Sequence, residues 1–268
     1  MALRTDAIDP TRFTVIRLLS GAAVLVLIRV IVGAISGKKP DFRSDGTWTS
    51  AALLFLYAMT FSFAYVSLAA GTGALILFGA VQLTMIGGAL QSGDRLPPAE
   101  WTGGIVAFAG LVVLTAPGLT APSLMGSLLM AVAGVSWGFY SLRGRGLSNP
   151  LVDTAGNFIR TLPFLFFPVV FAMPGVHPSL KGILLAVASG AVASGVGYSI
   201  WYAALQGLTG TQAAVVQLMA PVLAAAGGVV FLSEMITGRL IVSSIMVLGG
   251  VGLSIAGHAG LIRIRNRK

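Results

Sequence analysis

One stretch of sequence decides the fold: it runs GTQAAVVQLMAPVLAAAGGVVFLSE from Gly210 to Glu234. The stretch is apolar for long enough to cross a bilayer, which takes roughly 20 residues. A weaker copy lies in the first half of the chain, where Gly71-Thr72-Gly73 opens an apolar run to Leu90 and Asp94 follows. An acidic residue therefore ends a long apolar span in each half. This repetition predicts a duplicated membrane protein.

The composition makes lipid the solvent for most of the chain. Its 268 residues are 56% hydrophobic and 9% charged, and the mean hydropathy is +0.92. A soluble domain carries about 25% charged residues. The net charge of +9 lies mainly in short loops and in the C-terminal tail. That placement suits orientation in a membrane and argues against nucleic acid as a partner.

The apolar sequence divides into nine segments separated by short breaks with turn residues or charges. They cover residues 13–35, 50–68, 71–90, 101–117, 122–142, 151–173, 182–205, 210–232 and 238–258. None alternates with a period of two, and backbone groups in lipid need partners within their own segment. We therefore expect an all-α polytopic membrane protein with nine spans. Pro163 and Pro168 predict a bend in the sixth segment.

Loop charges predict the orientation. One set of alternate loops carries ten basic residues and the other set carries four. The richer set is expected on the cytoplasmic side. The C-terminus is then cytoplasmic, and nine spans place the N-terminus outside.

The spacing of acidic and glycine residues aligns the two halves. Asp94 precedes Gly110 by 16 positions, and Glu234 precedes Gly250 by 16 positions. The alignment predicts a first repeat of about four helices in residues 1–118 and a second of about five in residues 119–268. The segment 122–142 has no counterpart, so the first repeat is expected to lack its first helix. Units of five spans face opposite ways in the membrane, which predicts an inverted repeat.

Polar side chains within spans are the first candidates for function, because burying them costs free energy unless they find partners. Gln82, Asn157 and Gln217 lie within apolar segments, and each suits either a ligand contact or a clamp between helices. Arg160 is expected to reach the cytoplasmic interface, and Arg17 to do the same near the other face.

Aromatic side chains supply further candidates. Trp137 lies about two turns from a loop and is expected to line a cavity, together with Tyr140 and Tyr198. Tyr65 and Tyr202 lie nearer to span ends and are expected in the interfacial belt. Pro221 is expected to kink its helix.

Several functional groups are missing from the sequence. There is no cysteine, no cluster of His, Asp and Glu, no phosphate-binding loop and no paired nucleophile and base. We therefore expect neither an enzyme nor a metal or other cofactor. No Asp or Glu lies in the middle of a span, which argues against proton coupling through a buried carboxylate.

Two regions of the chain resemble a known family: Ile8-Asp9-Pro10-Thr11 leading to Arg17, and Gly197-Tyr198 and Trp201-Tyr202-Ala203-Ala204-Leu205 followed by Thr211, Gln217, Pro221 and Glu234. In these regions the chain is similar to EamA-type members of the drug/metabolite transporter superfamily. The resemblance implies two inverted five-helix repeats and export or exchange of small metabolites or drugs through a central cavity. This chain departs from the family in its apparent lack of the first helix, and in having Gln82 where a proline is common.

The sequence thus predicts a secondary transporter of a small organic metabolite or drug in the inner membrane, working by alternating access. Its expected substrate contacts are Gln82, Trp137, Tyr140, Asn157, Tyr198 and Gln217. The expected partners are the lipid bilayer and a small-molecule substrate, and a homodimer stays open. The alternative is a membrane scaffold or subunit that does not transport, or an inactive truncated carrier.

Overall fold

The protein is described by a computed structural model that covers residues 8–37, 46–93, 97–116, 123–170, 178–232 and 235–258. Every regular element in these ranges is helical. Local capping sets where helices begin. The Asp9 carboxylate accepts the backbone N–H of Arg12 at 2.9 Å just before Pro10, the first residue of α1. Thr209 and Gln212 form a capping box at the start of α10.

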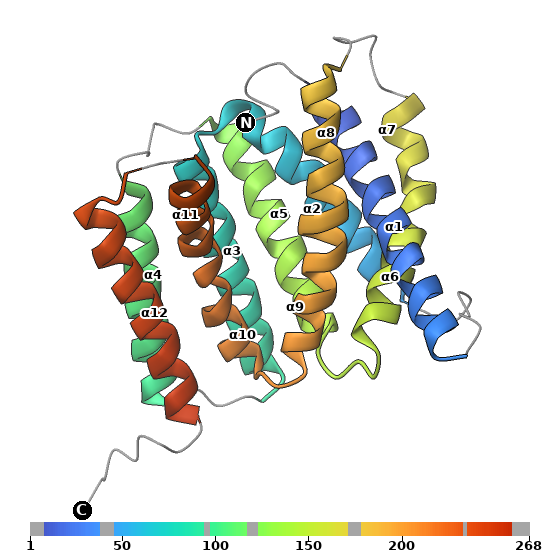
Figure 1. Cartoon of the computed structure of the whole chain (residues 1–268). Helices are drawn as coiled ribbons and strands as arrows, with labels where there is room; N and C mark the ends of the chain where they lie inside the picture. Colours follow the sequence, from blue (N-terminus) through green and yellow to red (C-terminus); the bar gives the residue numbers. More distant parts are fainter. Residues whose placement is uncertain are drawn as a thin grey trace, which may run out of the picture. The chain divides into compact units, whose positions relative to one another are not determined.

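Eight helical segments in the described ranges are long and apolar enough to cross a membrane (Figure 1). They are α1 (Pro10–Ile35), α2 (Trp48–Ser67), α3 (Ala70–Gln91), α4 (Pro98–Thr115), α5 (Leu124–Arg143), the run of α8 (Leu180–Ala188), η3 (Ser189–Val196) and α9 (Gly197–Leu205), the pair α10 (Gly210–Gln217) and α11 (Met219–Leu232), and α12 (Gly238–His258). These segments confirm the all-helical membrane fold that the sequence predicts.

The sixth predicted segment, 151–173, is broken. It consists of α6 (Pro150–Thr161), the 3₁₀ turn η2 (Leu162–Leu165) and α7 (Phe166–Val170), while residues 171–173 lie outside the described ranges. A proline has no N–H to donate and its ring crowds the preceding turn. Pro163 lies in η2 and Pro168 in α7, so the predicted bend is a change of helix type. The nine predicted spans therefore become eight candidate spans and one broken segment.

The chain divides into two compact units. Unit 1 comprises Met1–Leu68 and Ser123–Gly207, and unit 2 comprises Ala69–Pro122 and Leu208–Lys268. Each unit takes helices from both predicted halves of the sequence. The predicted repeats, 1–118 and 119–268, and their inverted relation stay predictions.

Unit 1 is built around two helix pairs, because α2 packs along α5 and α1 packs along η3. The segment α6 also contacts α1, α2 and α9. The pairing of α1 with η3 is close because glycines replace larger side chains at the crossing. A Cβ atom on Gly21 would lie 3.1 Å from the carbonyl oxygen of Gly190 and would overlap the ring of Phe158.

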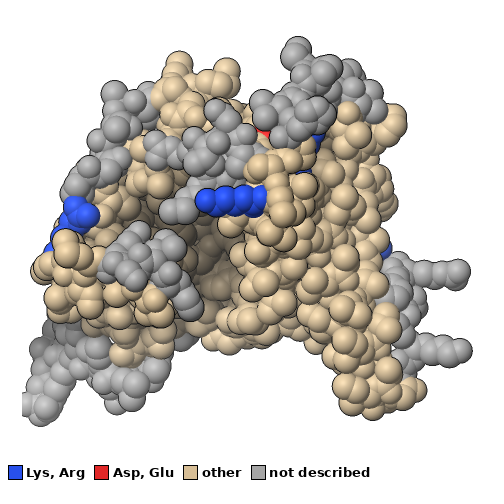
Figure 2. Space-filling view, turned by 45° about the horizontal axis from the view of Figure 1, so that its top comes forward, with Lys and Arg blue, Asp and Glu red and all other residues tan. Residues whose placement is uncertain are grey.

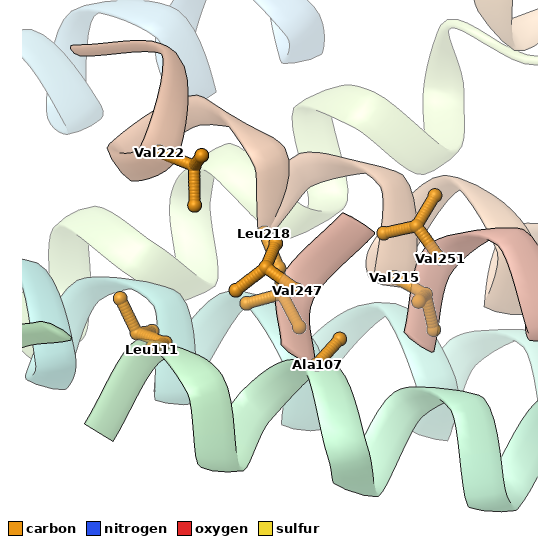
Figure 3. Packing of buried hydrophobic residues seen from close by; sticks show 7 residues of the cluster. All are labelled: Ala107, Leu111, Val215, Leu218, Val222, Val247 and Val251. Atoms are coloured by element: carbon orange, nitrogen blue, oxygen red, sulfur yellow. The ribbon is translucent and has the colours of Figure 1, made fainter. Parts of the chain in front are cut away.

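Unit 2 is organised by α4 and α12, which lie side by side (Figure 1). Side chains from these two helices and from α10 and α11 converge on one apolar cluster (Figure 3). Its buried members are Ala107, Leu111, Val215, Leu218, Val222, Val247 and Val251. All are of small or medium size, which lets the helix backbones approach closely.

The exposed surface of the described residues is rich in large apolar side chains. Leu83 is 79% exposed and Ile35 is 81% exposed. Charged side chains are sparse on the face drawn in Figure 2. Such a surface is unfavourable in water and suits contact with lipid.

Candidate functional site

An aromatic cluster from three helices lies in unit 1. The Trp137 ring, on α5, lies with its centroid 4.5 Å from Tyr198 on α9 and 5.0 Å from Tyr57 on α2. The Tyr140 ring lies 5.5 Å from Trp137 and 6.4 Å from Tyr198. The three aromatic residues proposed from sequence are therefore neighbours, and Tyr57 joins them. Tyr57, Tyr140 and Tyr198 are buried, and Trp137 is half-buried.

Arg17 lies against this cluster. Its Nε donates to Ser194 Oγ at 2.8 Å, and its Nη2 donates to Tyr198 Oη at 2.6 Å. The guanidinium carbon lies 5.4 Å from the centroid of Tyr57 and 5.5 Å from that of Phe61. The side chain is 5% exposed, so the expectation that Arg17 reaches an interface is wrong. Its side chain stays inside unit 1 because it donates hydrogen bonds to hydroxyl oxygens there and lies against aromatic faces.

A π-helix positions the partners of Arg17. The segment η3 replaces α-helical geometry over eight residues in the middle of its span and carries Ser194. π-Helical segments are rare in proteins, and those that occur often lie at functional sites. A Cβ on Gly190 would overlap Ser20 Oγ and the carbonyl oxygen of Arg17. Glycine at this position therefore permits the approach of η3 that brings Ser194 to the guanidinium.

Tyr202 and Trp201, next to this cluster, join α9 to the end of α5. Tyr202 is fully buried, stacks on Tyr140 at 4.9 Å and donates from its hydroxyl to the Tyr140 carbonyl at 3.0 Å. The placement of Tyr202 in the interfacial belt is therefore wrong, because its hydroxyl finds a backbone acceptor inside the unit. Trp201 Nε1 donates to Ser141 Oγ at 3.0 Å and reinforces the same contact. Tyr65 is half-buried and stacks edge-on against Phe61.

Asn157 joins α6 to the start of α2. Its Oδ1 accepts the backbone N–H of Thr47 at 2.9 Å, and the side chain is 2% exposed. Asp153 accepts the N–H of Gly46 at 3.3 Å, and Arg143 Nε donates to Ser50 Oγ at 3.1 Å at the same helix start. The amide oxygen of Asn157 therefore has a hydrogen-bond partner within the protein, independently of any contact with a substrate.

Replacing Asn157 with alanine is expected to lower the free energy of unfolding by about 1–3 kcal/mol. The variant removes the acceptor for Thr47 and leaves a space at a buried position. The measurement is thermal denaturation of the purified protein in detergent. Ser199→Ala is the control, because the Ser199 hydroxyl donates to the Gly195 carbonyl one turn earlier in the same span, and its removal leaves no donor without an acceptor. Equal melting temperatures for the two variants would contradict the clamp.

The two candidate glutamines lie in unit 2, on α3 and α10. Gln82 Nε2 donates to the carbonyl oxygen of Ala214 at 2.8 Å. Gln217 contacts the sulfur of Met85 at 2.8 Å. Both side chains are buried and hold α3 against α10. The sequence left open whether Gln82 contacts a ligand or joins two helices. In the structure its side chain joins α3 to α10.

The helix break near Pro221 explains why Ala214 needs this donor. The helix ends at Gln217 and resumes at Met219, one turn before the proline. The N–H of Leu218 bonds to Val215 at 3.1 Å, one residue short of its α-helical acceptor Ala214. Gln82 supplies a hydrogen bond to that carbonyl.

Glu100 is a buried group that sequence reasoning passed over. It lies in the first turn of α4, is 2% exposed and accepts a hydrogen bond from the Thr211 hydroxyl on α10. The expectation against proton coupling rested on the lack of an Asp or Glu in the middle of a span. Glu100 does not lie in the middle of its span, but it is a buried carboxylate that this reasoning did not count. A carboxylate in the first turn is also stabilised by the helix dipole. Sequence reasoning looked for carboxylates in the middle of spans and therefore overlooked Glu100, which lies at a span end.

Unit 2 also contains a cavity of about 750 Å³ among α3, α4 and α10. Most of its wall is apolar, including Ile86 and Phe108. Gln82, Glu100 and Thr211 also line it and supply polar atoms. Its size is in the range of ligand pockets, but Leu83 and Ile105 on its wall are strongly exposed, as lipid-facing residues are.

The structure therefore divides the predicted site residues between the units. Trp137, Tyr140, Asn157 and Tyr198 lie in unit 1, and Gln82 and Gln217 lie in unit 2. No group of three metal-binding side chains occurs among the described residues. The acidic residues that align the halves, Asp94 and Glu234, lie outside the described residues, as do His177 and the side chain of His258.

Comparison with known proteins identifies relatives of the chain. Residues 124–256 match the model of the EamA-like transporter family. An uncharacterized protein of Pseudomonas aeruginosa is 44% identical over 263 residues, covering 97% of this chain and 88% of that protein. A probable amino-acid metabolite efflux pump of Escherichia coli is 24% identical over 229 residues, covering 76% of this chain and 77% of the pump. A solved crystal structure with 24% identity matches with a TM-score of 0.76, over 94% of this chain and 90% of its own, and shows the same fold.

Proposed function

Because the chain belongs to the EamA-like transporter family, we propose that it exports or exchanges a small organic metabolite or drug across the inner membrane by alternating access. The two predicted repeats, inverted with respect to each other, form the two halves of the carrier. The C-terminus is cytoplasmic, as the excess of basic residues in one set of loops supports.

The observation that carries this proposal is the buried aromatic and polar cluster in unit 1. Aromatic rings combined with a few fixed hydrogen-bonding groups are what a pocket for a small organic molecule requires. Polar and ionisable groups buried inside membrane-spanning segments are costly and mark solute pathways. A relative named as a probable amino-acid metabolite efflux pump supports a metabolite as the cargo and export as the direction.

Export is tested by comparing media from cells that express the chain with media from matched cells that do not. We expect at least one organic solute to accumulate faster outside the expressing cells, as mass spectrometry of the medium would detect. Trp137→Ala is expected to reduce that export roughly fivefold or more, because a central aromatic contact contributes much of the binding free energy. Expression in the membrane is measured for each variant.

Trp48→Ala is the matched control. It makes the same exchange at the start of α2, where the side chain is 57% exposed. Its export is expected to equal that of the unaltered chain. Media that do not differ between expressing and non-expressing cells for any solute would refute transport, and equal export by both tryptophan variants would move the site elsewhere.

A further inference from the structure

Arg17 holds a buried positive charge with no carboxylate partner among the described residues. Its hydrogen bonds go to the neutral hydroxyl oxygens of Ser194, Tyr198 and Tyr57. Moving a charged group out of water is costly unless a counter-charge accompanies it. Contacts with two aromatic faces return only part of that cost. The site is therefore built for a negative charge that the described chain does not supply.

The guanidinium has donors left for such a charge. Nε bonds to Ser194 and Nη2 to Tyr198, while Nη1 has no hydrogen-bond partner in the described residues. The contact of Nη2 with Tyr57 Oη is 3.5 Å, at the limit for a hydrogen bond. A small rotation of Tyr57 would open the edge between Nη1 and Nη2. That edge has the fork geometry that binds both oxygens of a carboxylate.

The surroundings of Arg17 restrict the rest of the ligand. The rings of Tyr57 and Phe61 lie beside the guanidinium. Trp137 packs against Tyr57 and against Tyr198, whose hydroxyl accepts from Arg17. The next buried cation on α1 is Arg29, twelve residues further along and therefore about 18 Å away along the helix axis. A single positive charge with aromatic walls fits one negative charge on an apolar or aromatic body. A doubly charged phosphate would lack a second cation.

We propose that Arg17 binds the carboxylate of the substrate, and that the substrates are small organic acids with one negative charge and an apolar or aromatic body. Tyr57, Trp137 and Tyr198 contact that body, and Ser194 and Tyr198 hold the guanidinium in place. The cluster reaches the surface of unit 1 at the half-buried rings of Phe61 and Trp137. This inference rests on the proposed transport function, because it assigns the substrate class of the same site.

The test uses probes that share a benzyl group and differ in the charge of the group that it carries: phenylacetate, phenylacetamide, benzylphosphonate and phenethylamine. Binding to the purified full chain in detergent is measured by calorimetry. We expect phenylacetate to bind about tenfold or more tightly than phenylacetamide, because a charged partner strengthens the hydrogen bonds of the guanidinium. Benzylphosphonate and phenethylamine are expected to bind no better than the amide.

Variants separate recognition from structure. Arg17→Gln is expected to abolish the preference for phenylacetate over phenylacetamide, and Arg17→Lys to keep a reduced preference, because a lysine retains the charge without the fork. A purely structural role for Arg17 would lower stability without changing this ratio. If Arg17→Gln does not fold, Tyr198→Phe takes its place, and the loss of the hydroxyl that orients Nη2 is expected to reduce the ratio.

The outcomes distinguish the inference from the function on which it rests. Equal affinity for acid and amide, a ratio unchanged in Arg17→Gln, or phosphonate bound as tightly as carboxylate would each overturn the assignment of Arg17. Any of these results together with export of some other solute would leave the transport function standing. An absence of export for every solute, with phenylacetate still bound through Arg17, would overturn the transport function and keep the anion site.

Discussion

Replacing Gly190 with alanine is expected to lower the free energy of unfolding by about 3 kcal/mol, at the upper end of the cost of overpacking a core. A Cβ at this position would overlap the Ser20 hydroxyl and the Arg17 carbonyl oxygen. The carbonyl belongs to the backbone of α1, so it cannot turn aside as a flexible side chain would. The helix η3 must then move away from α1. Ser194 would move with η3, so the hydrogen bond to Arg17 is lost as well.

The measurement is the melting temperature of the purified protein in detergent, which we expect to fall by roughly 6 °C or more. Gly197→Ala is the matched control, since a Cβ there would meet its nearest neighbour, the Val192 carbonyl oxygen, at an ordinary 3.6 Å. Alanine in a helix interior is otherwise favourable relative to glycine, so the control is expected to be neutral or slightly stabilised. A Gly190→Ala protein as stable as this control would show that η3 does not depend on the close approach.

The helices were predictable because their physical cause is local. A span needs a run of apolar residues, and the caps at Asp9 and Thr209 are written within a few residues of the helix starts that they form. The bend at Pro163 is local in the same way, because proline acts on its own turn. The sequence predicts a bend in this segment. The structure has a change of helix type in the same segment, at Pro163.

The orientation of side chains around each helix was much harder to predict. In lipid, the outer face of a helix is as apolar as the inner face, so hydrophobic periodicity does not mark the buried side. Tyr202 was assigned to the interface because of its position along the span, but its ring stacks inside unit 1 on Tyr140. Trp137, Tyr140 and Tyr198 were selected as candidates by their positions along the spans, and the structure places their rings next to one another.

Arg17 and Glu100 show a second limit. Arg17 was judged by its distance from a span end and Glu100 was passed over, but the burial of both depends on partners far away in the chain. Arg17 bonds to Ser194, and Glu100 accepts from Thr211. Nothing local in the sequence marks these pairs or the π-helix that carries Ser194. The one usable signal was the arginine itself. An ionisable residue inside an apolar span is a candidate for function, however close it lies to the end of that span.

The crossing of α4 and α12 in unit 2 leads to the second large effect. A Cβ on Gly103 would overlap the Gly250 carbonyl oxygen and lie 2.7 Å from the backbone nitrogen of Ser254. A Cβ on Gly250 would lie 2.5 Å from the Gly103 carbonyl oxygen and 2.7 Å from the backbone nitrogen of Ala107. The two glycines therefore face each other, each with a small residue four positions later, the spacing that lets membrane helices touch along their backbones.

Gly103→Ala and Gly250→Ala are each expected to lower the free energy of unfolding by about 2–3 kcal/mol, because either methyl group forces the two helices apart. The double variant is expected to lose clearly less than the sum, since the separation forced by one substitution makes room for the other. Gly249→Ala and Gly252→Ala are controls on the same helix, where a Cβ meets nothing within 4 Å. Melting temperatures of the unaltered protein, the two single variants and the double variant form the cycle, and those of the two control variants are measured beside them. Additive losses in the double variant would mean that the two glycines act on separate contacts, and losses no larger than in the controls would mean that the crossing tolerates a wider spacing.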